Sequence, residues 1–247
     1  MSAVVVIPCY RSVLDPDEQL SIRQCLEVLG HHDLCVVAPE GLDLPGLLAD
    51  LPCERFPAGC FADIGAYNRL LLGPEFYVRF ARHEYLLIHQ LDAYVFRDEL
   101  DEWCGRGVDY VGAPWPDDEF LRKRKWRSAF PLHLRPPMLA RCIRCCDFRV
   151  GNGGFSLRRI PAFLAVLDRH AVAARDWPTN EDVFWSLAAP VYDRKFRIPP
   201  EREAMRFAVE RDPARYLRRM AGRLPFGCHA WRKHGFVIWK PHLRAEG

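Results

Sequence analysis

Three short runs made almost entirely of apolar residues constrain the fold most strongly. They are Val4–Pro8, Leu34–Ala38 and Tyr85–His89. Runs this short and this uniformly apolar are typical of parallel strands that are buried on both faces of a sheet. Between the first two runs, residues 15–18 have the pattern of a helix start and residues 30–33 that of a helix end. A strand, a helix and a second strand joined by short connections form a right-handed parallel unit. The sequence therefore predicts an α/β fold with a mostly parallel central sheet and flanking helices.

Length and composition favour one folded unit and exclude several classes of protein. The chain has 247 residues, of which 49% are hydrophobic, enough for a substantial core, and we predict a single domain over residues 1–247. A net charge of +3 and the lack of a recognition motif argue against nucleic acid as a partner. No apolar run approaches about 18 residues and the start does not resemble an export signal, so we expect a cytoplasmic protein.

Residues 115–150 differ in character from the rest of the chain. They contain prolines, a basic run at Arg122–Arg127 and little periodicity. A segment of this length without clear elements is usually a functional lid or partly disordered. The basic run is either a solvated loop or a contact for anionic lipid or a phosphorylated acceptor. Cys142, Cys145 and Cys146 are either reduced thiols or zinc ligands, and the absence of a second pair at ligand spacing favours thiols.

The segment Gly151-Asn152-Gly153-Gly154 is the strongest functional signal. Three glycines in four positions allow the backbone to pass close to a bulky group, which an ordinary packed strand does not require. The residues that follow, Phe155–Arg158, alternate like a strand. The segment predicts a wall that faces a ligand, and a plain glycine hairpin is the alternative.

An acidic cluster, Asn180-Glu181-Asp182, opens an apolar helical run soon afterwards. Either Glu181 or Asp182 suits the role of a general base that takes a proton from a hydroxyl group. Their position in a first helical turn favours the ionised carboxylate and predicts a lowered pKa. The alternative is that they only cap the helix, but Asn180 already suits the cap position.

A glutamine and an aspartate follow the third apolar strand, in the order Gln90-Leu91-Asp92. Ligands of open α/β sheets bind outside the carboxyl ends of the strands, so Asp92 is well placed for chemistry. Far along the chain, His229 lies in a stretch rich in groups that bind anions, metals or sugars.

The order of these features resembles that of glycosyltransferases of the GT-A type. Such enzymes begin with a short strand that ends near a proline and an aromatic residue, here Pro8 and Tyr10. A helix with a Tyr-x-Arg-Leu character follows, here with Arg69. Next comes a strand that ends in an Asp-x-Asp motif, which holds a divalent metal and the nucleotide diphosphate. The corresponding residues here are Gln90 and Asp92, a variant of that motif.

The second half of the chain is similar to galactosyltransferase-like members of that class. They carry a Gly-Gly-Phe-Ser segment, here beginning with Gly153 and Gly154, and then an acidic cluster, here Glu181 and Asp182. Many end with a histidine that binds the metal, which His229 resembles. More specifically, most of residues 4–235 looks like a bacterial family of unassigned function that is grouped near glycosyltransferases.

The resemblance implies a hexosyltransferase that uses a nucleotide-sugar donor and a glycan or lipid-linked acceptor. It implies that Pro8, Tyr10, Arg69, Gln90, Asp92, Gly153 and Gly154 bind the donor, that Asp92 and His229 bind Mn²⁺ or Mg²⁺, and that Asp182 or, second, Glu181 is the base. The basic run then suggests peripheral contact with the inner face of a membrane.

The neutral Gln90 distinguishes this chain from the usual motif. One negative charge fewer faces the cation, so we expect the cation to bind weakly. Four basic residues are available to neutralise the diphosphate instead: Arg69, Arg158, Arg232 and Lys233. The other possibility is that the chain is a non-catalytic relic of the same fold that binds a nucleotide or a carbohydrate.

Overall fold

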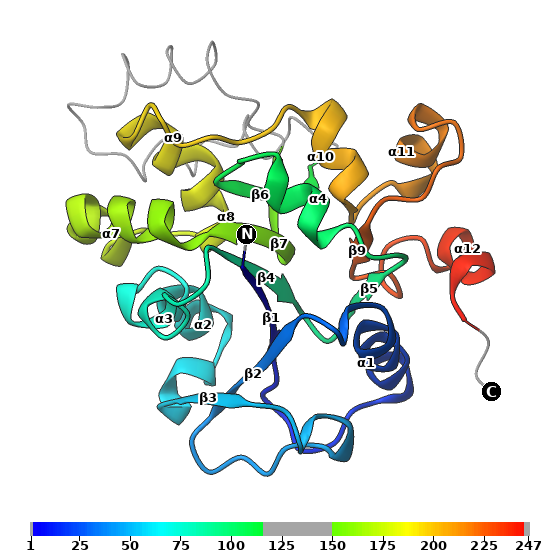
Figure 1. Cartoon of the computed structure of the whole chain (residues 1–247), viewed down its shortest axis with the longest axis horizontal. Helices are drawn as coiled ribbons and strands as arrows, with labels where there is room; N and C mark the ends of the chain where they lie inside the picture. The colour runs from blue at the N-terminus through cyan, green and yellow to red at the C-terminus, as the bar shows by residue number, and fades with distance from the viewer. Residues whose placement is uncertain (1, 116–149, 245–247) are drawn as a thin grey trace.

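The structure, a computed structural model, describes residues 2–115 and 150–244 (Figure 1). Its first half contains the elements β1 (Ala3–Pro8), α1 (Pro16–Leu29), β2 (Asp33–Pro39), β3 (Cys53–Phe56), α2 (Ile64–Leu70), α3 (Pro74–Val78), β4 (Tyr85–His89), β5 (Ala93–Val95), α4 (Leu100–Gly105) and β6 (Tyr110–Pro114). Its second half contains β7 (Val150–Arg159), α7 (Ile160–Arg175), α8 (Glu181–Val183), α9 (Ala189–Tyr192), α10 (Glu201–Phe207), β8 (Ala208–Val209), α11 (Pro213–Arg219), β9 (Gly227–His229) and α12 (Phe236–Trp239). The basic run and the cysteine cluster predicted above lie outside the described residues.

The central sheet has the strand order β3-β2-β1-β4-β7-β6 among the described residues. Strands β3, β2, β1 and β4 are parallel, and β7 runs antiparallel to both of its neighbours, β4 and β6. The predicted fold class, α/β with a mostly parallel central sheet and flanking helices, is confirmed. The reversed β7 was not predicted, and it brings its own first residues to the edge where β4 ends.

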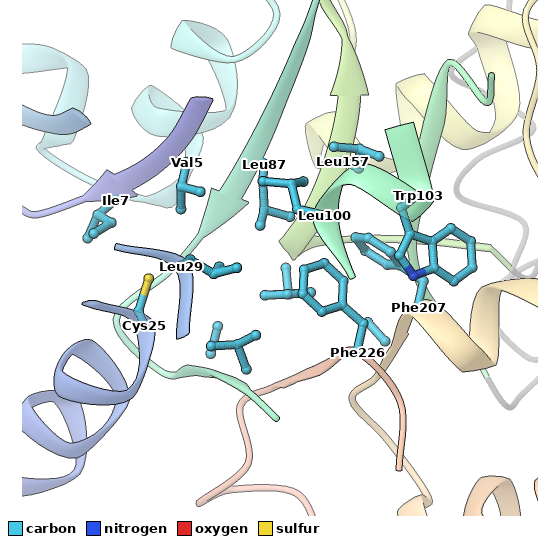
Figure 2. Close-up of a cluster of buried hydrophobic side chains, with 14 of the residues drawn as sticks. Val5, Ile7, Cys25, Leu29, Leu87, Leu100, Trp103, Leu157, Phe207 and Phe226 are labelled. Atoms are coloured by element: carbon cyan, nitrogen blue, oxygen red, sulfur yellow. The ribbon is translucent and has the colours of Figure 1, made fainter. Parts of the chain in front are cut away.

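The predicted burial of the central strands on both faces is confirmed, and it explains their uniform composition. Val4 and Val6 of β1 pack into one core, together with residues of α2, α3 and α7. Val5 and Ile7 pack into the opposite core, which includes residues of α1, α4 and α10. Figure 2 shows this second core, where Val5 and Ile7 lie near Cys25 of α1 and Leu87 of β4. Since successive side chains of a strand point to opposite faces, each position must be apolar.

Local signals fixed the helix that follows β1. The carboxylate of Asp15 accepts a hydrogen bond from the amide of Glu18, whose own carboxylate accepts one from the amide of Asp15. With Pro16 in the first turn, this is a complete capping box. Further along, Gly73 and Pro74 separate α2 from α3, and α7 begins at Ile160 with a proline in its first turn.

Two predictions about the second half were wrong in detail. The strand expected from Phe155 begins earlier, because β7 starts at Val150 and contains the glycine segment. The helix expected from Asn180 is not uniform either. It starts as α8, continues as a π-helical turn over Phe184–Ala188 and ends as α9. Such wide turns occur mostly as short insertions, often at functional sites.

A second, smaller sheet was not predicted at all. It has the order β5-β9-β8 among the described residues, and Ala93 of β5 pairs with His229 of β9. Strands of two or three residues are too short to give a periodic signal. This sheet places His229 of β9 next to Asp92. Within the ranges the structure describes, no helix is long and apolar enough to cross a membrane.

Candidate active site

The glycine segment lies where the end of β4 meets the start of β7. Because these strands are antiparallel, His89 pairs with Phe155, and the amide of Gln90 donates to the carbonyl of Gly154 over 2.9 Å. The segment therefore lies beside Gln90 and Asp92, at the carboxyl ends of the parallel strands. Two groups of polar side chains, one on either side of the segment, make up the candidate site.

The glycines are required by protein side chains that approach their backbone. A Cβ atom at Gly154 would collide with Nε2 of His229, and one at Gly153 would lie 2.5 Å from Oε1 of Glu181. Gly151 has a φ of 146°, which favours glycine, and a Cβ there would collide with the Ser186 hydroxyl. The sequence analysis inferred that a bulky group lies close to the backbone of this segment. Such groups are present, but they are side chains of the protein itself.

On one side lies a histidine cluster formed by Gln90, Asp92, Glu210 and His229. Nε2 of His229 is 3.1 Å from Oδ1 of Asp92 and 3.1 Å from Oε1 of Gln90. Its other ring nitrogen, Nδ1, is 3.5 Å from Oε1 of Glu210. The ring is 12% exposed, whereas the Asp92 side chain is 53% exposed, so the cluster opens to solvent through Asp92.

Glu210 is a site residue that the sequence analysis missed. It directly follows β8, and its other carboxylate oxygen accepts a hydrogen bond of 3.0 Å from the amide of the Asn152 side chain. The carbonyl oxygen of that same side chain accepts from the amide of Gly154. Glu210 therefore links His229 to the glycine segment. An acidic residue after the apolar run Phe207–Val209 was the one available signal.

Electrostatics make this cluster attractive for a cation. Burial disfavours a charged ring, but the carboxylates of Asp92 and Glu210 outweigh it and raise the pKa of His229 to about 9. Burial also acts to raise the pKa of each carboxyl group, yet the His229 ring holds the pKa of both Asp92 and Glu210 below the usual values. Two carboxylates thus compete for one imidazole.

The donor atoms around Nε2 have the spacing that a divalent cation needs. Ligand atoms about 2.1 Å from an ion are about 3 Å apart when they are neighbours in an octahedral shell. Asp92 and Gln90 meet this distance to His229. A set of one nitrogen and two oxygens suits Mn²⁺ better than Mg²⁺. Glu210 on the far nitrogen is the carboxylate that commonly orients a metal-binding histidine.

On the other side lies an arginine cluster formed by Tyr77, Arg158, Glu181 and Asp182. The fully buried guanidinium of Arg158 donates to Oε1 of Glu181 over 2.8 Å and to the Tyr77 hydroxyl over 2.9 Å. Arg158 is therefore committed to this ion pair, and the expectation that it is available to neutralise a diphosphate was wrong. Asn180 also makes no side-chain cap bond. The carbonyl oxygen of the Asn68 side chain accepts from the Glu181 amide instead.

Asp182 differs from Glu181 in its partners. It is half-buried, and its Oδ1 has no hydrogen-bond partner among the described residues. Burial first, and the charges of Glu181 and Glu210 next, raise the pKa of Asp182 to about 8. The lowered pKa expected from the helix start was wrong. Burial beside other carboxylates outweighs the favourable effect of the helix start.

Three predicted donor-binding residues lie outside both clusters. Pro8 is buried at the end of β1, Tyr10 is 52% exposed and carries the guanidinium of Arg11 over its ring, and Arg69 is exposed on α2. None of them forms a hydrogen bond or ion pair with the described members of either cluster. The motif that contains Arg69 reaches the site through its neighbour Asn68.

The fold has counterparts among solved structures. The structure of WbbM, a bifunctional glycosyltransferase in its apo form, matches 92% of this chain with a TM-score of 0.51 at 14% identity. The chain spans 45% of that structure. The galactosyltransferase LgtC in complex with donor and acceptor sugar analogs matches 92% of the chain and 86% of its own length, with a TM-score of 0.48 and 10% identity. The fold is that of GT-A glycosyltransferases.

The family is shown by a second comparison. A family model described as "Protein of unknown function (DUF5672)" matches residues 50–229, and the chain belongs to this family. A third structure, core-mannan synthase A of Aspergillus fumigatus in its Mn/GDP form, matches 77% of the chain and 69% of its own length, with a TM-score of 0.46 and 10% identity. No curated protein matches the chain.

Proposed function

We propose that this protein is a glycosyltransferase that moves a hexose or aminosugar from a nucleoside diphosphate to a glycan or lipid-linked acceptor. One observation carries the proposal. His229 comes from a distant part of the chain and lies within hydrogen-bond distance of both Gln90 and Asp92, at the carboxyl ends of the sheet strands. On a glycosyltransferase fold, this is a position where a donor diphosphate can bind.

The histidine cluster serves the donor. Asp92, His229 and Gln90 would hold Mn²⁺ or, less well, Mg²⁺, which would neutralise the charge that develops on the diphosphate leaving group. Glu210 keeps Nε2 of His229 directed toward Asp92 and Gln90. Gly153 and Gly154 leave the backbone of β7 open beside them. Because Gln90 is neutral, the ion is held weakly.

The arginine cluster serves the acceptor. Asp182 accepts the proton of the acceptor hydroxyl, since Arg158 bonds to Glu181 and not to Asp182, and burial raises the pKa of Asp182 to about 8. Arg158 fixes Glu181, and this fixes the start of the helix that carries Asp182. Glu181 is then a positioning residue rather than the base.

A binding protein without turnover is the second candidate. The feature that favours it is Gln90, which removes one anionic ligand from the cation site. Such a relic would still bind a nucleoside diphosphate or a carbohydrate at the same place. The distinction therefore depends on turnover, not on binding.

The test is a thermal-shift panel of nucleoside diphosphates with and without Mn²⁺, followed by mass analysis of products from donor and acceptor mixtures. A ligand at about 100 times its Kd adds about 2.7 kcal/mol of stability. One nucleoside diphosphate should raise the Tm only when Mn²⁺ is present, and His229→Gln should abolish this dependence. The matched control is His242→Gln, which changes an exposed histidine outside the site. A panel without any shift would overturn the transferase proposal and the nucleotide-binding form of the second candidate.

We also propose that the enzyme works in the cytoplasm at the inner face of the membrane. The basic run Arg122–Arg127 supports this, since clustered cations attract anionic lipid headgroups. A lipid-linked acceptor would then be presented at the same surface. Sedimentation with vesicles that contain anionic lipid, compared with neutral vesicles, tests this location.

A further inference from the structure

A second group of ligand-type side chains lies away from the candidate active site. His31 and His32 form the turn between α1 and β2, and Asp98 lies between β5 and α4. One donor atom from each of the three side chains lies within 4.8 Å of the others. Nε2 of His31 and Nε2 of His32 are each 2.9 Å from the same oxygen of Asp98, Oδ2. The sequence pattern of residues 30–33 had indicated only a helix end.

This group is remote from the histidine cluster. Glu18, in the first turn of α1, lies within electrostatic range of Asp92, whereas His31 follows the other end of that helix. A helix of 14 residues is about 21 Å long. The two sites therefore lie at opposite ends of α1, and His31, His32 and Asp98 take no part in the chemistry proposed above.

The Asp98 carboxylate is held in place by its second oxygen. Oδ1 accepts a hydrogen bond of 2.9 Å from the amide of Leu100 at the start of α4, which leaves Oδ2 facing the two imidazoles. Burial acts to raise the pKa of Asp98, but the Leu100 amide and His32 hold it below its usual value. Fixing a ligating carboxylate through its other oxygen is common at metal sites.

We propose that His31, His32 and Asp98 bind a transition-metal cation such as Zn²⁺, as a structural clasp between the α1–β2 and β5–α4 turns. Two imidazoles and one carboxylate suit Zn²⁺ and its neighbours, whereas Mg²⁺ and Ca²⁺ select oxygen ligands. In a tetrahedral zinc site with bonds of about 2.0 Å, ligand atoms are about 3.3 Å apart. The two distances of 2.9 Å need to open by only a few tenths of an ångström.

The exposure of the three side chains fits an open site with a water ligand. His32 is 11% exposed and Asp98 30%, while His31 is 64% exposed and free to adjust its ring. The rings already lie close together, with centroids 4.2 Å apart. A bound cation would replace the contacts of the two imidazoles with Oδ2 of Asp98 by three metal–ligand bonds, one to each side chain.

The experiment is a calorimetric titration of the full chain with Zn²⁺, in which variants are compared with the wild type. His32→Gln and Asp98→Asn should each lose one equivalent of bound Zn²⁺ or weaken it at least about tenfold. His242→Gln, an exposed histidine elsewhere, should leave that equivalent unchanged. His229→Gln should also leave it unchanged, because it alters only the candidate active site.

A second measurement identifies the ligands. With Co²⁺ as the probe, the wild type should show visible absorption typical of a low-coordinate nitrogen and oxygen site, and Asp98→Asn should lose it. Asparagine retains an oxygen for the Leu100 amide, so this variant keeps the start of α4. Should His32→Gln fail to fold, the exposed His31→Gln takes its place. Equal Zn²⁺ stoichiometry and affinity in the wild type, Asp98→Asn and His31→Gln would overturn the proposal.

Discussion

The two clusters on either side of the glycine segment contain the same kinds of charge but balance them differently. Each places two carboxylates around one basic side chain: Asp92 and Glu210 around His229, and Glu181 and Asp182 beside Arg158. Arginine keeps its proton at any ordinary pH, whereas histidine can give its proton up. The extra negative charge must therefore be neutralised differently in the two clusters.

In the arginine cluster, the extra negative charge favours a proton on Asp182. In the histidine cluster, the extra negative charge favours a bound metal cation. Arg158 bonds to Glu181, and the raised pKa of Asp182 follows from the charge left over. His229 lies between two carboxylates, so a divalent cation can displace its proton from Nε2 and meet Asp92. The contrast predicts which changes affect chemistry, stability and cation binding.

The largest expected effect is on turnover when the proton acceptor is removed. Asp182→Asn should lower kcat by about 10²–10⁴, the usual contribution of a general base. Donor affinity should change little, because we propose that Asp182 acts on the acceptor. Product formation under saturating donor, together with donor titration, measures both quantities. Unchanged turnover would leave Asp182 as part of a helix start only.

The next effect is on stability and concerns the residue before it. Glu181→Gln leaves the buried Arg158 without its anion and should lower the free energy of unfolding by about 3–5 kcal/mol. Turnover by the folded protein should fall less than in Asp182→Asn. Chemical denaturation measures the first quantity. Arg175→Met, which breaks an exposed ion pair with Asp176, is the control and should leave the unfolding midpoint unchanged.

A third change, at Gly154 of β7, affects only the histidine cluster, because this glycine packs against His229. Gly154→Ala puts a methyl group where Nε2 of His229 lies, so His229 must move away from Asp92. Affinity for Mn²⁺ should fall about 10–100-fold, as when the orientation of a ligand is lost. Calorimetry measures the affinity. Gly105→Ala is the control, since a Cβ there meets nothing within 4 Å.

The pH dependence of turnover tests whether Asp182 titrates as the arginine cluster requires. With a pKa of about 8, the carboxyl group is mostly protonated at pH 7 and mostly ionised at pH 9. Glu181 and Glu210 raise this pKa and Arg158 opposes them, while burial contributes most. Because a base must be ionised, kcat/KM should rise about tenfold over this interval. A profile that is flat from pH 6 to 9 would contradict the assignment.

The smallest expected effect is a gain. Gln90→Asp replaces the neutral oxygen that lies 3.1 Å from Nε2 of His229 with an anionic carboxylate on a shorter side chain, and should tighten Mn²⁺ binding severalfold. Calorimetric titration of both proteins decides the point. Gln90→Leu removes the side-chain oxygen altogether and should weaken Mn²⁺ binding. Equal affinity in all three proteins would show that Gln90 does not face the ion.

The parts of the fold that were predicted correctly are those with local causes. The strands β1, β2 and β4 follow from uniform apolar runs, and α1 follows from its capping box. The small sheet was missed because its strands have two or three residues and depend on pairing between Ala93 and His229. The prediction that residues 1–247 form one domain stays a prediction, since residues 116–149 lie outside the described part.

Residue types at strand ends indicated the candidate site, but not the partners of those residues. Gln90, Asp92, His229 and the acidic pair were selected from the sequence, and the structure places them around the glycine segment. Their roles stay proposals. Glu210 and the Asn68 bond to Glu181 were missed, because nothing in a local pattern tells which distant backbone group a polar side chain will meet.

The distances along the chain between site residues have a consequence for the order of folding. The bond between Asn68 and Glu181 joins residues 113 positions apart, and the contact between Gln90 and His229 spans 139. Such closures are entropically costly and come after local structure in folding. Helices with local caps, such as α1, can therefore form before these contacts. The candidate site is complete only when β7 and β9 have paired, so refolding experiments should recover helical signal before cation binding.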